Sequence, residues 1–342
     1  MRKPVVLVTG ASGEIGHGLL ERLAAIGTRA VVTLDVVPLD PEVRVYVQRE
    51  VPGSILDRSL LERLLAEYEI DQIFHLAALL STRAEFSPPS GHEVNVGGTL
   101  SLLEFAQKEA ESHGRTVTFL YPSSIAVYGL PDVETKRKAG RVREHEWAAP
   151  TTMYGCNKLY CEQLGRYYAR HYKQLSVDRP RAGVDFRALR FPGLISAATV
   201  PSGGTSDYAP EMFHAAARGA PYACFVRPDT RIPFMAMPDA VDALMAIADA
   251  PRDRLTLTAY NVRAFAPTAD EVRQEVLRAF PRATVTFAVD PKRQGILDSW
   301  PEDTDDAAAR RDWGFNPASD FDRAVRQYLT PGIRGKYATS PK

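Results

Sequence analysis

The chain of 342 residues has few cysteines, no excess charge and no long apolar run. Its three cysteines form no Cys-x-x-Cys pair, so neither a disulfide framework nor a zinc site is indicated. The 42 basic residues balance the 42 acidic ones, which argues against a nucleic-acid binder and favours a small-molecule partner. The apolar runs are too short to cross a membrane or to form a signal segment. These absences predict a soluble cytoplasmic protein that needs no metal.

A glycine-rich turn follows the first predicted strand. Residues 5–9 form a β-branched run, and Gly10, Gly13 and Gly16 then lead into leucines at helical spacing. Glycines let the backbone turn tightly and approach a pyrophosphate, whose charge is met by the amide groups at the helix N-terminus. The pattern Gly-x-x-Gly-x-x-Gly between a strand and a helix therefore predicts a dinucleotide site.

An acidic residue ends the second predicted strand, residues 30–35. Asp35 stands about twenty residues beyond the turn, where a carboxylate can accept hydrogen bonds from both ribose hydroxyls. The same charge would repel the 2′-phosphate of NADP, so the sequence predicts NAD as the cofactor. An aspartate that caps a turn at the strand end is the alternative.

Two later predicted strands end in residues that suit a ligand crevice. The strand at 71–78 closes on Ala77 and Ala78, whose small side chains leave room for a cofactor. The strand at 116–121 leads through a proline into two serines, the second of which is Ser124. Serines at the carboxyl end of a strand lie in the crevice of a doubly wound sheet. They are equally common as turn hydroxyls.

A tyrosine and a lysine share one face of a later predicted helix. Tyr154 and Lys158 are four residues apart, so the phenol and the ammonium lie one turn from each other. A nearby cation stabilises the phenolate and lowers the tyrosine pKa from about 10, which would let the phenol take a proton from an alcohol. The same spacing also arises by chance on amphipathic helices. Thr151 or Thr152 could cap this helix.

The order of these elements predicts an α/β fold, a doubly wound parallel sheet of the Rossmann type with a small mixed C-terminal substrate lobe. Residues 1–190 are expected to form the dinucleotide-binding core, to which parts of 190–262 return. Residues 191–330 are expected to form mainly the substrate-binding lobe, and 331–342 a C-terminal tail.

Four connecting segments carry weaker patterns. Residues 44–47 suggest a short strand, and residues 79–89 suggest a polar loop with prolines. Residues 130–150 suggest a charged, solvated loop, with a lid or a partner contact as the alternative. Residues 201–206 suggest a flexible polar loop.

The motifs, taken in this order, resemble those of the extended short-chain dehydrogenase/reductase superfamily. The resemblance runs from about residue 4 to about residue 328 and is far more specific than any single motif. In that superfamily a serine orients the substrate hydroxyl, a tyrosine is the acid/base, and a lysine holds the nicotinamide ribose. The resemblance assigns these roles to Ser124, Tyr154 and Lys158, and it implies a homodimer.

Further segments resemble the short-chain type of L-threonine 3-dehydrogenase within that superfamily. These segments include residues 79–81, 150–155, 185–196, 203–209 and 298–301. The resemblance implies NAD-dependent oxidation of L-threonine at its 3-hydroxyl to 2-amino-3-oxobutanoate, with Tyr154 as general base.

Two other functions remain open at this point. A nucleotide-sugar epimerase or dehydratase of the same superfamily is the first alternative. Epimerases usually carry Arg-x-x-Asn-x-Tyr-Gly where this chain has Arg-Phe-Pro-Gly at 190–193, which counts against them. A non-catalytic NAD-binding regulator is the remote alternative.

The resemblance also completes the predicted site. Ser54 departs from the family, because an aspartate usually reaches the adenine amine there. The predicted cofactor contacts are Gly10, Gly13, Glu14, Ile15, Gly16, Asp35, Ser54, Ile55, Leu76, Ala77, Ala78, Asn95, Pro122, Tyr154, Lys158, Pro192 and Leu194. The predicted substrate contacts are Ser81, Ser124, Tyr154, Thr205, Ser206 and Trp300.

Overall fold

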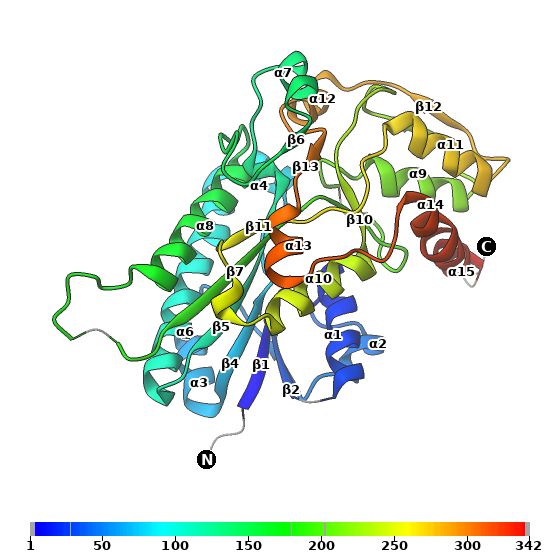
Figure 1. Ribbon diagram of the computed structural model, residues 1–342. Coiled ribbons are helices and arrows are strands. Elements are labelled where there is room, and N and C mark those ends of the chain that lie inside the picture. The colour runs from blue at the N-terminus through cyan, green and yellow to red at the C-terminus, as the bar shows by residue number, and fades with distance from the viewer. Residues whose placement is uncertain (1–3, 28, 179, 202, 339–342) are drawn as a thin grey trace.

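The computed structural model describes residues 4–27, 29–178, 180–201 and 203–338 (Figure 1). A seven-stranded sheet lies at its centre, with the strand order β11-β7-β5-β4-β1-β2-β3. Its strands are β1 (Pro4–Thr9), β2 (Ala30–Asp35), β3 (Arg49–Pro52), β4 (Glu69–His75), β5 (Val117–Ser124), β7 (Val184–Phe191) and β11 (Ala259–Asn261). All its pairings are parallel, which confirms the predicted doubly wound α/β fold.

Helices cover both faces of the sheet, because successive residues of a strand point to opposite sides. Val6 and Val8 of β1 pack with two helices, and Val5 and Leu7 pack with three others. The first pair is α1 (Glu14–Ile26) and α10 (Met237–Asp249); the other three are α3 (Arg58–Glu67), α6 (Gly98–His113) and α8 (Met153–Arg170). Burial on both faces explains why the strands read as continuous β-branched runs in the sequence.

A smaller mixed lobe packs over the carboxyl end of β5 (Figure 1). Its core contains Tyr208, Phe213 and Trp300 and continues into residues 125–128, which directly follow β5. The elements of the lobe are β8 (Gly193–Ile195), α9 (Tyr208–Ala217), β9 (Tyr222–Cys224), β10 (Phe234–Ala236), α11 (Ala269–Ala279), β12 (Val285–Phe287), α12 (Pro291–Asp298), η4 (Ala324–Leu329) and α15 (Thr330–Ala338). The lobe is thus attached to the strand end that carries Ser124.

Shorter elements connect these parts. They are α2 (Pro41–Arg44), α4 (Ser81–Phe86), α5 (Pro88–His92), η1 (Glu93–Gly97), η2 (Ile125–Val127), α7 (Val133–Ala139), β6 (Arg141–Val142), η3 (Arg252–Arg254), β13 (Asp303–Thr304), α13 (Ala307–Trp313) and α14 (Phe321–Arg323). No helix in the described part of the chain is long and apolar enough to cross a membrane.

Two of the weaker expectations are wrong. Residues 44–47 are not a strand, because Pro41 begins helix α2 and the edge strand β3 follows only after a turn. Residues 79–89 are not a loop, because they contain α4 and the start of α5. A proline has no N–H to donate and fits the first turn of a helix, so Pro88 and Pro89 begin a helix here instead of excluding one.

The C-terminal residues up to Ala338 are helical, and Ile333 of α15 is fully buried in the core of the lobe. Residues 339–342 of the predicted tail lie outside the described residues. So does Ser202 of the predicted loop at 201–206.

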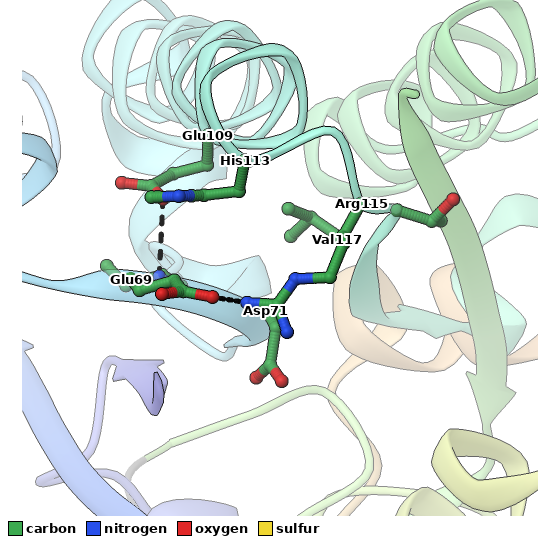
Figure 2. Close-up of a pocket in the computed structure, with 8 residues that line it drawn as sticks. Glu69, Asp71, Glu109, His113, Arg115 and Val117 are labelled. Carbon is green, nitrogen blue, oxygen red and sulfur yellow. Dashed lines mark hydrogen bonds and ion pairs between the residues drawn. The ribbon is translucent and has the colours of Figure 1, made fainter. Parts of the chain in front are cut away.

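A small cavity of about 10 Å³ lies at the amino ends of β4 and β5 (Figure 2). The Glu109 carboxylate accepts a hydrogen bond from the Ile70 N–H at 3.3 Å and lies 2.9 Å from the His113 ring nitrogen. Glu69 forms an ion pair with Arg115 beside it. The cavity has room for about one water molecule and lies at the opposite end of the sheet from Ser124, so it belongs to the packing of the sheet.

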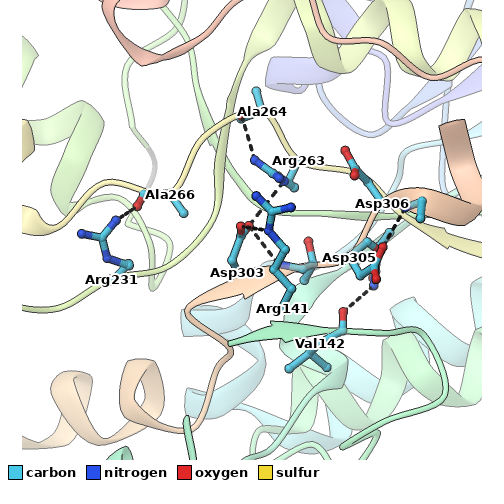
Figure 3. Close-up of polar contacts among 12 residues, drawn as sticks. Arg141, Val142, Arg231, Arg263, Ala264, Ala266, Asp303, Asp305 and Asp306 are labelled. Carbon is cyan, nitrogen blue, oxygen red and sulfur yellow. Dashed lines mark hydrogen bonds and ion pairs between the residues drawn. The ribbon is translucent and has the colours of Figure 1, made fainter. Parts of the chain in front are cut away.

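The segment from 130 to 150 has many exposed side chains, as expected, but it is not a free loop, because it contains α7 and β6 and is bound to the lobe. Strand β6 in this segment pairs with β13 near the end of the chain. The Asp303 carboxylate forms ion pairs with Arg141, at 3.1 Å, and with Arg263, at 3.5 Å. Figure 3 shows these three residues together. The ammonium of Lys136 is buried and donates to the Leu297 carbonyl at 2.9 Å. These partners come from distant parts of the sequence, so the charge pattern at 130–150 alone could not reveal them.

Helix α8 approaches the sheet closely at Gly165. A Cβ atom at this position would lie only 2.3 Å from the Phe186 ring of β7. Gly165→Ala is therefore expected to lower the free energy of unfolding by about 1–3 kcal/mol, because the added methyl group must displace the ring or the helix.

Gly295→Ala is the matched control for this prediction. Gly295 lies within α12, and a Cβ atom there would meet nothing within 4 Å. Alanine at this position should be neutral or should stabilise the protein by up to about 1 kcal/mol. Chemical denaturation of both variants checks the prediction, and equal unfolding free energies would contradict the close packing of α8.

Candidate functional site

The first turn of α8 carries Tyr154 to the end of β5. The Thr152 hydroxyl accepts a hydrogen bond from the Gly155 N–H at 3.1 Å, so Thr152 is the cap of this helix. A Cβ atom on residue 155 would lie 2.0 Å from the Ala126 carbonyl oxygen, just beyond β5. Glycine beside Tyr154 thus lets the helix start against the residues that follow Ser124.

The structure brings together Ser124, Tyr154 and Lys158. The Ser124 hydroxyl and the Tyr154 phenol share a hydrogen bond. The Lys158 ammonium lies 5.4 Å from the centroid of the Tyr154 ring and 4.6 Å from that of Tyr121. It also donates to the Pro122 carbonyl at 2.6 Å, two residues before Ser124. The arrangement places two hydroxyls and one cation at the carboxyl end of β5.

Burial dominates the protonation of this cluster. It raises the pKa of Tyr154 to about 12, against the effect of the Ser124 hydrogen bond. It lowers the pKa of Lys158 to about 8, while Cys161 and Glu162 act in the opposite direction. The expectation that Lys158 lowers the phenol pKa is therefore wrong for this structure. The ammonium lies over the tyrosine ring and is bonded to a carbonyl oxygen, while Tyr154 is partly buried against the core of the lobe.

The glycine turn forms a cradle at the same edge of the sheet. Gly10 has a φ of +69°, and a Cβ atom there would lie 2.3 Å from the Ala77 nitrogen. Helix α1 begins after Gly13 with no side-chain cap among the described residues. The Asp35 carboxylate accepts hydrogen bonds from the Ser12 and Val37 N–H groups, both at 2.9 Å. Open amide groups at a helix start beside a cradle without side chains fit the pyrophosphate of a dinucleotide.

Asp35 thus has two roles open to it. Its hydrogen bond to Ser12 joins the end of β2 to the glycine turn, as the turn-capping alternative requires. A carboxylate has about four acceptor positions, so the two backbone bonds leave capacity for ribose hydroxyls. The observed geometry is therefore compatible with both turn capping and ribose binding.

Two other predicted cofactor residues, Asn95 and Ser54, form hydrogen bonds with nearby backbone. Asn95 is buried, and its amide pairs with the backbone of Leu79, accepting at 2.7 Å and donating at 3.0 Å. It therefore fixes the segment after β4 that includes Leu76, Ala77 and Ala78. Ser54 uses its hydroxyl to accept from the Leu56 N–H at 3.2 Å, beyond the end of β3.

Two predicted substrate residues from distant segments meet. The Thr205 hydroxyl donates to the Ser81 hydroxyl oxygen at 3.1 Å, which joins the start of α4 to the loop before α9. The Asp207 carboxylate accepts from the Gly203 and Gly204 N–H groups at 2.9 and 2.5 Å and so shapes this loop. The structure therefore presents a hydroxyl pair close to the lobe.

Ser206 and Trp300 differ from this pair. Ser206 lies beside Gly193 at the start of β8. Trp300 is 4% exposed and belongs to the core of the lobe, against which Tyr154 also packs. Its indole N–H has no hydrogen-bond partner among the described residues. A surface hollow of about 470 Å³ opens next to it, lined by Leu130, Thr151, Ile296 and Ser299 among others.

The sequence did not reveal the buried polar partners of the cluster. Glu162 and Arg190 form an ion pair behind Lys158, at 2.7 Å. One signal was available, because Glu162 stands four residues after Lys158 and shares its helix face. Arg293 donates to the Gly204 carbonyl at 3.1 Å, and no pattern in the sequence indicated this contact. No group of three or more His, Cys, Asp or Glu residues in the described ranges is placed to hold a metal ion.

Comparison with known proteins agrees with this geometry. The model of the family described as "NAD dependent epimerase/dehydratase family" matches residues 6–262. The chain belongs to this family. The match confirms the resemblance to the extended short-chain dehydrogenase/reductase superfamily that the motifs indicated.

Several members of the NAD dependent epimerase/dehydratase family are similar over almost the whole chain. A mitochondrial L-threonine 3-dehydrogenase of Bos taurus is 35% identical over 331 residues, which cover 95% of this chain and 81% of the relative. The holo form of a GalE-like L-threonine dehydrogenase from Cupriavidus necator is 33% identical, with a TM-score of 0.83 and coverage of 96% and 99%. A monomeric L-threonine 3-dehydrogenase from a metagenome is 32% identical, with a TM-score of 0.83 and the same coverage.

Glu14 links the cradle to the loop that carries Thr205. Burial raises the pKa of Glu14 from 4.5 to about 7, and the charge of Asp207 adds to this effect. Because the folded-state pKa lies above the unfolded value, the folded protein loses stability as the pH rises from about 4.5 to 7.

Glu14→Gln is expected to raise the free energy of unfolding by about 1–3 kcal/mol near pH 8 and by much less near pH 5, because glutamine never acquires the buried charge. Denaturant titrations at the two pH values measure this difference. Glu62→Gln, at an exposed position of α3, is the control and should show no such pH dependence. Equal effects of Glu14→Gln at both pH values would contradict the assigned burial of the charge.

Proposed function

We propose that this chain is an NAD-dependent L-threonine 3-dehydrogenase that forms 2-amino-3-oxobutanoate. The observation that carries the proposal is the cluster of Ser124, Tyr154 and Lys158 at the same sheet edge as the Gly10 cradle. Relatives that bear this enzyme name and match nearly the whole chain support the choice of substrate.

In the proposed reaction Tyr154 takes the proton of the threonine 3-hydroxyl. Ser124, which shares a hydrogen bond with the phenol, orients that hydroxyl toward Tyr154. Lys158 is proposed to hold the nicotinamide ribose. NAD, when bound, supplies the acceptor for the hydride of C3. A phenol with a pKa near 12 keeps its proton at neutral pH, so turnover should rise with pH until Lys158 begins to lose its charge near pH 8.

The proposed substrate contacts divide between the two parts of the protein. Ser81 and Thr205 form the hydroxyl pair described above and are proposed, with Ser206, to hold the amino and carboxylate groups. Trp300 is proposed to close the pocket from the core of the lobe, where its indole N–H has no partner among the described residues. Asp35 is proposed to bind the adenosine ribose.

An epimerase or dehydratase acting on a sugar nucleotide is the alternative within the same family. Such enzymes return the hydride to the substrate, so no NADH accumulates, whereas threonine oxidation produces NADH with each turnover. Incubation with NAD and either L-threonine or UDP-glucose separates the two. A non-catalytic NAD-binding regulator would oxidise neither. A homodimer and a cytoplasmic location are further parts of the proposal, although one relative is described as monomeric.

Tyr154→Phe is expected to lower the rate of NADH production with L-threonine by at least about a thousandfold, because phenylalanine cannot accept the hydroxyl proton. NAD binding should persist, since the aromatic ring and Lys158 remain. Tyr160→Phe is the matched control, because Tyr160 is on the same helix and 54% exposed. Steady-state kinetics and calorimetric NAD titration provide the readouts, and near-normal turnover of Tyr154→Phe would refute the acid/base role.

The Asp35 carboxylate makes a separate prediction about the cofactor. The wild type should have a much higher kcat/KM with NAD than with NADP, because Asp35 repels a 2′-phosphate. Asp35→Asn keeps acceptor capacity for the Ser12 N–H but removes the charge, so the preference should shrink by about tenfold or more. A wild-type preference for NADP would show that Asp35 only caps the turn.

A further inference from the structure

Glu162 lies one helical turn beyond Lys158 on α8 and is only 2% exposed. Its carboxylate accepts two hydrogen bonds from the Arg190 guanidinium, from Nε at 2.9 Å and from Nη2 at 2.7 Å. A third bond comes from the Ser123 hydroxyl at 2.5 Å. One buried carboxylate on α8 therefore holds the ends of two adjacent strands.

These contacts bracket the proposed catalytic cluster. Ser123 stands opposite Arg190 in the register of β5 and β7, so both side chains reach the same face of the sheet. Ser123 also separates Pro122, whose carbonyl accepts from Lys158 at 2.6 Å, from Ser124, which bonds the Tyr154 phenol. A change in the position of Ser123 must therefore move the partners of both Lys158 and Tyr154.

The network continues away from α8. Arg190 donates through Nη1 to the Tyr128 hydroxyl at 2.9 Å, and Tyr128 donates to the Asn261 side chain at 2.7 Å. The Asn261 amide then donates to the carbonyl of Val142 at 3.0 Å, in the β6 region drawn in Figure 3. The segment bound to the lobe is thus connected to α8 through buried hydrogen bonds.

We propose that Glu162 is a positioning residue for the reaction: with Arg190 it holds Ser123 against α8, and its negative charge keeps Lys158 in the ammonium form. The kcat measurement that tests this role rests on the proposed function. The second measurement, the affinity for NADH, needs no threonine oxidation.

The charge of Glu162 matters because Lys158 has mostly neutral neighbours. The titratable groups that face it are Tyr154 and Cys161 on α8, Tyr121 on β5 and His75 on β4. Burial raises the pKa values of both tyrosines and of the cysteine and lowers that of His75 to about 3, so all four are uncharged near neutral pH. Glu162 is thus the carboxylate that opposes the loss of the Lys158 proton.

Glu162→Gln tests the charge directly. Glutamine keeps the size and an acceptor oxygen, but Lys158 should lose its proton at lower pH, since Glu162 is, after Cys161, one of the two groups that raise its pKa. In the wild type, NADH affinity and kcat should both fall at high pH, and this fall is called the alkaline limb. In Glu162→Gln the alkaline limb of both quantities should move down by about one pH unit. NADH fluorescence measures the affinity. Near pH 8 this shift corresponds to a loss of about fivefold.

A second variant guards against a failure to fold, because Glu162→Gln leaves Arg190 buried without its counter-ion. The double variant Glu162→Gln with Arg190→Met removes both charges. It should recover most of the thermal stability lost in the single variant. Its alkaline limb should lie between those of the wild type and the single variant, because the opposing charge of Arg190 is removed as well. A wild-type alkaline limb in the folded single variant Glu162→Gln would show that the pair is only structural and would overturn the proposal.

Ser123→Ala tests the positional part. The ion pair remains, so the alkaline limb should stay in place, while kcat falls several-fold and the KM for NAD is unchanged. A wild-type kcat for this variant would overturn the role of Ser123 in placing Ser124.

Asp185→Asn is the matched control, because Asp185 and Arg187 form an equally buried pair on the same strand, at 2.7 Å and away from α8. It should lower stability without moving the alkaline limb, and a movement equal to that of Glu162→Gln would overturn the proposal.

The experiments distinguish failure of the proposed function from failure of the role of Glu162. If wild-type protein produces no NADH from L-threonine but Glu162→Gln shifts the NADH affinity limb, the proposed function fails and the role of Glu162 stands. If the wild type oxidises threonine but the alkaline limbs of NADH affinity and kcat do not move in folded Glu162→Gln, the proposed function stands and the role of Glu162 fails.

Discussion

The close approach of helix α8 to the parallel sheet is the constraint on which the candidate site depends. Glycines at 155 and 165 bring the helix within contact distance of Ala126 and Phe186. This spacing brings a phenol, an ammonium and a hydroxyl together at the end of β5. The same burial that assembles the cluster raises the pKa of Tyr154 and lowers that of Lys158. Packing and proton chemistry are therefore set by one contact surface.

Much of the fold could be predicted from local patterns. The β-branched runs, the glycine turn and the leucine spacing identified the central strands and helices. Both faces of the sheet are buried, so its strands need apolar residues at nearly every position, and such runs are visible in the sequence. The segments at 44–47 and 79–89 failed because prolines there begin helices, which a single sequence does not distinguish from loop prolines. The attachment of the segment at 130–150 to the lobe was missed because its partners, such as Asp303, lie far along the chain.

The candidate site divides in the same way. The motifs placed Ser124, Tyr154 and Lys158, and the structure brings them together. The direction of the Tyr154 pKa shift was not predictable, because it depends on how much water the folded protein excludes. Arg190 was noticed only in the segment 190–193 that differs from epimerases, yet its guanidinium joins α8, β5 and the segment near β6. Spacing along a helix shows which residues share a face, while burial and partners across the sheet exist only in three dimensions.

The pairing of β6 with β13 has a consequence for synthesis of the protein. Strands β1 to β5 and their helices are complete in the first part of the chain and can assemble as it emerges from the ribosome. The segment that precedes Tyr154 has to wait for residues 303 and 304 before β6 finds its partner. A nascent or truncated chain that ends before these residues can therefore hold a formed parallel sheet beside an unfinished neighbourhood of the candidate site. The order of translation thus separates formation of the glycine cradle from completion of the surroundings of Tyr154.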